Sequence, residues 1–141
     1  MSVLRIALYA LTAAGLIVNA IIHLRLASAF DALTGTLLSQ GDLFRIQAVA
    51  GILIVVLLIA VRRWWVAAIA ALIAVGGLGM LVLSSFVILD LTALGLPAIF
   101  EPSWYPDKII AAVSQAVAAT AAGALAVLER RRRASGRASE S

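Results

Sequence analysis

Four stretches of this chain are long and apolar enough to cross a lipid bilayer. They run over about residues 3–26, 43–61, 64–89 and 107–128. A hydrocarbon core about 30 Å thick requires roughly 20 consecutive apolar residues in a helix. In lipid, each segment must also satisfy its own backbone hydrogen bonds. The sequence therefore predicts an all-α fold, a four-helix transmembrane bundle with up-down topology that occupies residues 1–129.

The composition leaves no room for a separate soluble domain. The chain has 141 residues, of which 64% are hydrophobic, and its mean hydropathy is +1.11. It has no cysteine, which excludes disulfide exchange, thiolate metal sites and cysteine nucleophiles. It also lacks a Gly-x-Ser-x-Gly elbow, a phosphate-binding loop and a paired intramembrane carboxylate. A non-enzymatic role is therefore favoured over an enzymatic one, without excluding the latter.

The charged residues predict how the bundle is oriented. In the up-down arrangement eight basic residues fall on one side and three, Arg25, Arg45 and Lys108, fall on the other. Positive charge accumulates on the cytoplasmic side of membrane proteins, so both termini are predicted to be cytoplasmic. Residues 130–141 are predicted to form a disordered basic cytoplasmic tail. The net charge of +4 is explained as a topology signal, and no nucleic-acid partner is expected. The eight residues are Arg5, Arg62, Arg63, Arg130 to Arg133 and Arg137.

The amino-acid usage points to a bacterial source. Ten of the eleven basic residues are arginine and alanine is abundant, a bias that fits a GC-rich genome such as that of an actinobacterium. We therefore expect a multi-pass protein of the bacterial plasma membrane.

The first apolar segment has an alternative interpretation as a signal peptide. Ala27-Ser28-Ala29 has the small-x-small form that a signal peptidase accepts. The apolar part is longer than the usual 7–15 residues, and His23 and Arg25 interrupt the approach to the site. We expect the segment to be retained as a helix. Cleavage would leave three helices and remove His23.

The polar residues inside the apolar segments all fall toward the side opposite the arginine clusters. Polar side chains in lipid are costly unless they are paired or hydrated, so this asymmetry predicts a polar pocket that opens outward. Arg25 and Glu101 lie near the same depth and could contact an anionic or polar group there. The candidate ligand-binding residues are Asn19, His23, Arg25, Gln47, Glu101 and Gln115, and Ser84 and Ser85 share their depth.

His23, the only histidine, lies on a polar and small-residue face of the first segment. Thr12, Gly15, Asn19 and His23 are spaced by three, four and four residues, so they share one face of a helix. Such a face also serves ordinary helix packing. His23 itself could satisfy a buried hydrogen bond, contact a small molecule or lipid head group, or ligate haem or a metal. We predict that Asn19, His23 and Gln47 form a hydrogen-bonded cluster within roughly 8 Å.

Two longer loops, residues 27–42 and 90–106, are predicted to cover the pocket. In the first loop Phe30, Leu33, Leu37 and Leu38 recur at helical spacing, which predicts a short helix on the membrane surface. The second loop is apolar but is broken by glycine and proline, so it is expected to form a partly buried lid.

Two short motifs resemble those of small four-span actinobacterial membrane proteins. These proteins carry a His-Leu pair at the end of helix one and Leu-Phe-x-x-Gln at the start of helix two, which here are Ile22–Leu26 and Leu43–Gln47. Their members are largely uncharacterised, so the resemblance implies a topology and not an activity. It also implies that His23 and Gln47 belong to one site. Phe30 stands where a tyrosine is expected, so no hydroxyl-dependent role is expected there.

Together these features favour a non-enzymatic accessory or binding protein. Its outward-facing pocket would hold a lipid, a quinone or part of a partner subunit, and its partners would be membrane lipids, a partner membrane subunit or further copies of itself. The alternative is a redox membrane protein in which His23 contacts haem or quinone. The sequence specifies no cofactor, and a visible absorption spectrum would separate the two functions.

Overall fold

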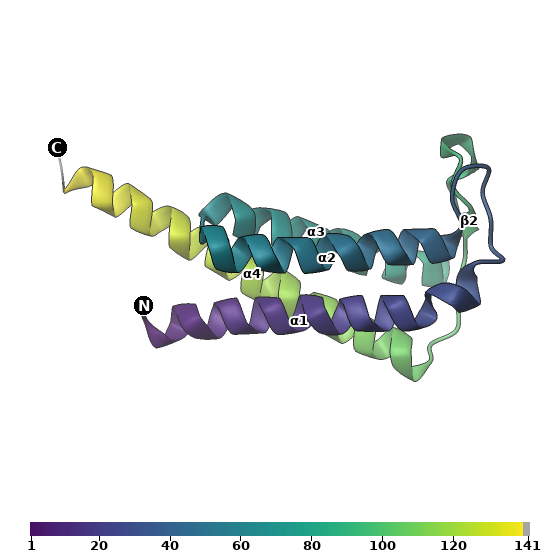
Figure 1. Cartoon of the computed structure of the whole chain (residues 1–141), viewed down its shortest axis with the longest axis horizontal. Coiled ribbons are helices and arrows are strands. Elements are labelled where there is room, and N and C mark those ends of the chain that lie inside the picture. Colours follow the sequence, from purple (N-terminus) through teal and green to yellow (C-terminus); the bar gives the residue numbers. More distant parts are fainter. Residues whose placement is uncertain (140–141) are drawn as a thin grey trace.

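The computed structural model describes residues 1–139 and consists mainly of four long helices, α1 to α4 (Figure 1). The all-helical class is confirmed, and all four helices are long and apolar enough to cross a membrane. Their outer surfaces carry large apolar side chains such as Leu72 and Phe86, as expected for helices that face lipid. The helices are Val3–Ala27 (α1), Gln40–Val61 (α2), Trp64–Phe86 (α3) and Pro106–Ala138 (α4).

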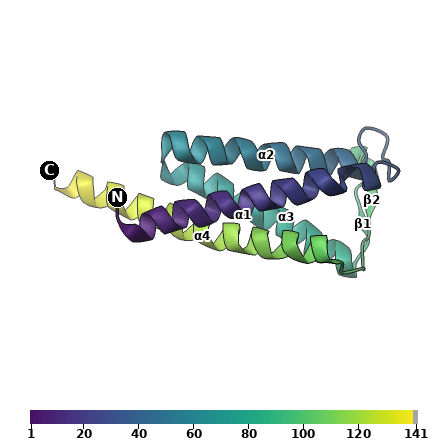
Figure 2. The ribbon, with the colours of Figure 1, turned by 60° about the horizontal axis from the view of Figure 1, so that its bottom comes forward.

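The helices form one bundle in which α4 packs along both α1 and α3, and α1 packs along α2 (Figures 1 and 2). The contact between α2 and α3 is the least extensive of the four. Both chain termini lie at one end of the bundle, which we call the termini end (Figure 1). The segments that connect α1 to α2 and α3 to α4 lie at the opposite end, which we call the loop end.

The most densely packed part of the core contains residues from all four helices. Leu16, Leu58, Val66 and Leu125 are fully buried there, and alanines of α3 and α4 fill the space between them. Small residues let helix backbones approach closely, and van der Waals packing then holds the helices together in lipid. This core lies away from the loop end and leaves that end less tightly filled.

Local hydrogen bonds explain where the helices begin and end. α2 begins at Gln40, before the expected residue 43, because Ser39 and Asp42 form a reciprocal capping box. α3 ends at Phe86, before the expected residue 89, because the chain then enters a two-residue strand. That strand, β1 (Leu89–Asp90), pairs antiparallel with β2 (Ala98–Ile99), and a short 3-10 turn, η2 (Thr92–Leu94), lies between them.

The first connecting segment does not contain the expected surface helix. A 3-10 turn, η1, covers Ser28–Phe30, and residues 31–39 form turns. The helix is absent because backbone groups that it would pair internally are used elsewhere. The N–H groups of Leu37 and Leu38 both donate to the carbonyl of Gly95 in the second segment, at 2.8 and 3.3 Å. The two segments are thereby joined into one roof over the loop end.

The basic tail also differs from its expected disorder. α4 continues as a helix through Ala138, so residues 130–138 are helical. Arginine and alanine are strong helix formers, which explains why the helix continues beyond its apolar part. The guanidinium of Arg130 also lies 5.7 Å from the centre of the Trp64 ring. The remainder of the expected tail, residues 140–141, lies outside the described residues.

Candidate functional site

A cavity of about 300 Å³ lies between the helices at the loop end. Its lining is mainly apolar and includes residues of α1, α2, α3 and α4 as well as the roof. Leu91, Leu96 and Ile99 of the second connecting segment are part of the lining. A mainly apolar cavity of this size with a few polar groups is typical of small-molecule sites.

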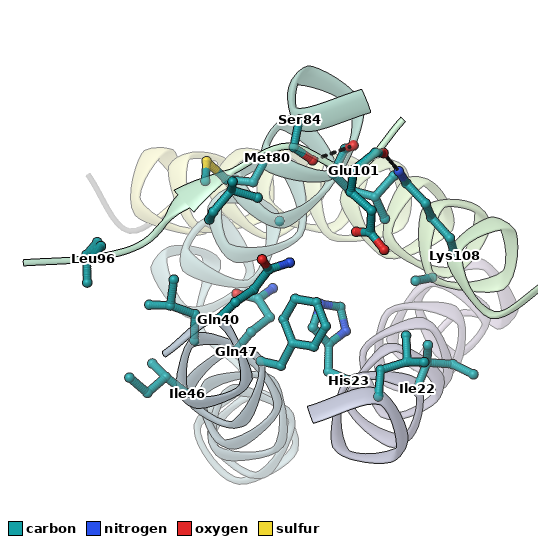
Figure 3. A pocket seen from close by; sticks show the side chains of 18 of the residues that line it. Ile22, His23, Gln40, Ile46, Gln47, Met80, Ser84, Leu96, Glu101 and Lys108 are labelled. Atoms are coloured by element: carbon teal, nitrogen blue, oxygen red, sulfur yellow. Dashed lines mark hydrogen bonds between the residues drawn. The ribbon is translucent and has the colours of Figure 1, made fainter. Parts of the chain in front are cut away.

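Polar side chains from all four helices and the second connecting segment converge on this cavity (Figure 3). Gln40 and Gln47 extend from α2, and the carboxylate of Glu101 approaches from the roof side. The other polar residues of the lining are His23 of α1, Ser84 of α3, Tyr105 directly before α4, and Lys108 of α4. The cavity therefore combines hydrogen-bond donors and acceptors with apolar walls.

His23 is held in one orientation by its own helix and by two phenylalanines. Its Nδ1 lies 2.9 Å from the backbone carbonyl oxygen of Asn19, one turn earlier. A carbonyl can only accept, so Nδ1 carries the proton, and Nε2 of the neutral ring is an acceptor. The edge of Phe44 packs on the imidazole with ring centres 5.1 Å apart, and Phe30 packs on Phe44 at 4.9 Å. The site thus presents one oriented hydrogen-bond acceptor.

Gln40 is a buried amide without a hydrogen-bond partner among residues 1–139. It is the first residue of α2, and only 2% of its surface is exposed. Its backbone N–H donates to Leu33, while its side chain points toward the centre of the cavity (Figure 3). Buried polar side chains are normally hydrogen-bonded. An amide in this position is therefore available to a molecule in the cavity.

Glu101, Tyr105 and Lys108 form a charged group at the roof. The Tyr105 hydroxyl donates to Glu101 Oε1 at 2.5 Å. Burial, together with this hydrogen bond, raises the pKa of Tyr105, so the hydroxyl stays a donor at physiological pH. The Lys108 ammonium donates to the Glu101 backbone carbonyl and lies 4.9 Å from the centre of the Trp104 ring. Glu101 is itself tied to α3 through its backbone N–H, which donates to Ser84 at 2.8 Å.

Lys108 is the most deeply buried charge of this group. Its exposed fraction is 2%, and no carboxylate within the described part of the chain lies within 4 Å of its ammonium. Buried charges are ordinarily paired. An ammonium that contacts a carbonyl and an aromatic ring retains donor capacity for an oxygen in the cavity.

A cluster of three amides lies below the cavity. Gln115 donates to the side-chain oxygen of Asn19 at 2.6 Å, and Gln47 lies 3.5 Å from the carbonyl of Ile73. A Cβ added to Gly77 would lie 2.6 Å from Gln47 Nε2 and 3.0 Å from the Gln115 amide, so glycine is what admits both side chains. Asn19 Nδ2 and Gln115 Oε1 are buried and have no partner within residues 1–139.

The structure brings some of the predicted residues together and separates others. His23, Gln47 and Glu101 line the cavity. Asn19 and Gln115 bond to each other and do not line it. The predicted cluster of Asn19, His23 and Gln47 forms only in part, because Gln47 bonds to neither of the others.

Arg25 lies outside the lining of the cavity. Its guanidinium is 3.3 Å from the Asp107 carboxylate, and most of its side chain is exposed. This ion pair joins the ends of α1 and α4 at the loop end.

Sequence reasoning missed Gln40, Phe44, Tyr105 and Lys108 as parts of the site. Gln40 precedes the second apolar stretch, so the sequence places it in a loop. The capping box of Ser39 and Asp42 makes it the first residue of α2. Lys108 did carry a signal, since it is the only lysine among eleven basic residues. An ammonium among guanidinium groups suggests a position with its own requirement.

No protein-family model, curated protein or solved structure matches this chain. Over residues 1–139, no group of three or more His, Cys, Asp and Glu side chains is arranged to hold a metal ion. The site is therefore interpreted from its own chemistry. It can accept a hydrogen bond at His23 and Glu101 and donate one from Gln40 and Lys108, within an otherwise apolar space.

Proposed function

We propose that this chain is a non-enzymatic membrane protein that binds one amphiphilic small molecule, a lipid or a quinone, in the cavity at the loop end. The main support for this proposal is the Gln40 amide, which is buried in the cavity lining without a hydrogen-bond partner in the described chain. The amide faces the cavity space, so its donor and its acceptor are both open to an occupant. A ligand with a polar head and an apolar body would bond to this amide and pack against the apolar walls.

The roof favours a small molecule over a partner subunit as the occupant. Hydrogen bonds join the two connecting segments over the loop end, and Leu91, Leu96 and Ile99 of the second segment line the cavity. A segment of another protein would have to displace this roof, whereas a single amphiphile fits below it. The proposal includes membership of the small four-span bacterial proteins that the two motifs resemble. In support, His23, Phe44 and Gln47 of those motifs share this one cavity.

The proposal places the protein in the bacterial plasma membrane, with up-down helices, both termini cytoplasmic and the cavity toward the outside. The support is the excess of basic residues in the segments at the termini end. Single cysteines can test it, since the chain has none of its own. An impermeant thiol reagent applied to intact cells should modify a cysteine at Gly35 or Ser103 and spare one at Ser135. Modification at Ser135 alone would reverse the orientation.

Ligand content tests the binding function. The protein should be purified in mild detergent and its bound small molecules identified by native mass spectrometry. We expect one amphiphile per chain in the wild type and at least a tenfold lower occupancy in Gln40→Leu, which keeps the volume and removes the amide. Thr12→Val is the matched control, because Thr12 is also buried but its hydroxyl donates to Leu8 of its own helix. Equal occupancy in wild type and Gln40→Leu would contradict the proposal.

The geometry of His23 favours a second candidate, a redox protein in which His23 contacts haem or quinone. Histidines that bind a metal usually donate their other ring N–H to a carbonyl or carboxylate, and His23 Nδ1 does this with Asn19. The absorption spectrum of the purified protein decides the haem case. A Soret band in the wild type that vanishes in His23→Gln would establish the redox function. A featureless spectrum would exclude haem.

A further inference from the structure

The cavity is not closed on all sides, because part of its lining belongs to the lipid-facing surface. Ile46 of α2 and Met80 of α3 line the cavity and are 52% and 39% exposed. Gly76 of α3 also lines it and is exposed. These three residues flank the contact between α2 and α3, which is the least extensive contact between neighbouring helices of the bundle. The cavity therefore reaches the outer surface of the bundle at this place.

Gly76 leaves open space where other residues would fill it. A Cβ added to Gly76 would have no heavy atom within 4 Å. The neighbouring Gly77 is different, because a Cβ there would meet the amides of Gln47 and Gln115. Gly77 is thus explained by packing against polar side chains, whereas nothing in the packing of the described chain requires glycine at position 76. The absence of a side chain at Gly76 leaves the space beside the cavity free.

The side opening is also the one that the roof leaves uncovered. Leu37 and Leu38 donate to Gly95 across the two connecting segments, and Glu101 is tied to Ser84 of α3. These bonds cover the end of the bundle, where a water-soluble ligand would have to enter. An apolar chain passing between α2 and α3 breaks none of them.

We propose that the ligand is a long-chain amphiphile whose hydrocarbon chain passes between α2 and α3 beside Gly76 into the bilayer, while its head lies below the roof next to Gln40. This inference rests on the proposed binding function. It adds the route of the ligand's hydrocarbon chain and the chemical class of its head. The buried, unpartnered Gln40 amide fixes the position of the head. The opening at Ile46, Gly76 and Met80 fixes the position of the ligand's hydrocarbon chain.

The side chains around the head define its chemistry. His23 Nε2 and the Glu101 carboxylate accept hydrogen bonds, and Gln40 and Lys108 donate them. The charges of Glu101 and Lys108 offset each other, so the site favours a head without net charge. A neutral head with carbonyl or hydroxyl oxygens satisfies both kinds of partner. Isoprenoid quinones and acylglycerols share this chemistry and are two sources of such a ligand.

Photocrosslinking of the full-length protein in lipid nanodiscs can test the route. The probe is a monoacylglycerol with a diazirine in the middle of its acyl chain, and labelled peptides are identified by mass spectrometry. We expect saturable labelling of the peptides that contain Ile46 and Met80. Competition by a long-chain menaquinone but not by diacylglycerol would identify a quinone as the source, and the reverse would identify an acylglycerol. Either result supports the head class, and saturable labelling that neither compound reduces would overturn it.

Two glycines of α3 provide a matched pair of variants. Gly76→Leu should block the opening and reduce saturable labelling at least tenfold. Gly79→Leu is the control, because a Cβ at Gly79 also meets no atom within 4 Å but Gly79 does not line the cavity. If Gly76→Leu fails to fold, Ile46→Trp narrows the same opening from an exposed position on α2. Its labelling should also fall.

The outcomes separate the route from the binding function. Normal labelling in Gly76→Leu or Ile46→Trp, with loss in Gln40→Leu, would overturn the route and leave the binding function intact. An absence of saturable labelling in the wild type, with no co-purified ligand, would overturn both. Equal loss in Gly76→Leu and Gly79→Leu would show a general effect of α3 substitutions and would overturn the specific role of Gly76.

Discussion

The two ends of the bundle differ in how their buried polar groups are paired. Toward the termini end, residues of all four helices form the buried core, and the Glu129 carboxylate is paired with Arg5 at 2.6 Å. A groove of about 290 Å³ between α1 and α2 also lies there, lined by residues such as Ile6 and Ile59. At the loop end the same four helices enclose a cavity of about 300 Å³ that contains the unpartnered Gln40 amide and the buried Lys108. The buried charges are paired at the termini end, whereas the loop end contains a buried ammonium with no carboxylate within 4 Å and an amide with no partner in the described chain.

The difference indicates where stability and function reside. Packing and paired charges hold helices together in lipid, so substitutions toward the termini end should affect the free energy of unfolding more than ligand binding. Natural proteins tolerate unsatisfied polar groups and cavities mainly where function requires them. Substitutions at the loop end should therefore affect ligand binding more than stability. A loop-end substitution that changed mainly the stability, or one toward the termini end that changed mainly ligand binding, would contradict this difference.

The largest loss of stability is expected from Leu58→Ala. Leu58 is fully buried in the core. In soluble cores Leu→Ala costs roughly 2–5 kcal/mol, and because the packing part of this cost persists in lipid, we expect about 2 kcal/mol here. Unfolding in mixed micelles with increasing SDS measures it. Leu53→Ala on the same helix is the control, because Leu53 is 58% exposed and should change little. Equal effects would mean that the packed core does not support the fold.

A smaller loss is expected when the ion pair at the termini end is broken. Arg5 Nε donates to Glu129 Oε1 at 2.8 Å, and both side chains are largely buried. Removing one member of a buried pair leaves the other uncompensated, so Glu129→Gln should destabilise the protein by about 1.5 kcal/mol. The control is Asp107→Asn at the loop end, where the partner Arg25 is mostly exposed, and its effect should stay below about 1 kcal/mol. A larger effect for Asp107→Asn would reverse the comparison.

The sequence was sufficient for the elements whose signal is local. Span length and hydropathy depend only on consecutive residues, so the four helices could be predicted from them. The depth of polar residues follows from their position in a helix. For that reason His23 and Gln47 could be placed near one depth, and both line the cavity.

The features that depend on contacts between distant residues could not be predicted. Glu129 reads as the end of a span, and only the packing of α1 on α4 reveals that it meets Arg5, 124 residues earlier. Gln40 reads as a loop residue, because its burial depends on how the roof folds over α2. Helical spacing places Leu37 in a surface helix. Its backbone N–H instead donates to Gly95 in the other connecting segment, and spacing does not reveal that partner. Helical spacing contains no information about such partners.

At the loop end, Gln40→Leu should leave the free energy of unfolding of the ligand-free protein unchanged or slightly higher. The substitution removes an amide that has no partner in the described chain, and loss of an unsatisfied group is neutral to stabilising. We expect a change below about 1 kcal/mol in the stabilising direction. SDS unfolding of delipidated wild type and variant measures it. A clear loss of stability would show that the amide supports the fold, and the loop end would then resemble the termini end.

The smallest expected effect concerns the roof and its pH dependence. Asp31 follows η1 and forms a two-pronged ion pair with Arg45, with N–O distances of 2.7 and 2.9 Å. The hydrogen bonds from Arg45 hold the pKa of the Asp31 carboxyl below its ordinary value of 3.8. Because the folded pKa is the lower one, this pair stabilises the roof above pH 3.8, and the contribution is lost as the pH falls through the folded pKa. Near neutral pH the roof should be insensitive to this carboxyl.

A carboxyl-selective NMR titration of Asp31 should give a midpoint below 3.8 in the wild type and one nearer 3.8 in Arg45→Gln. Arg25→Gln should leave the midpoint unchanged, since Arg25 pairs with Asp107 instead. A wild-type midpoint at or above 3.8 would mean that the pair with Arg45 does not hold the first connecting segment over the cavity, and that the roof depends on its backbone hydrogen bonds to Gly95 alone.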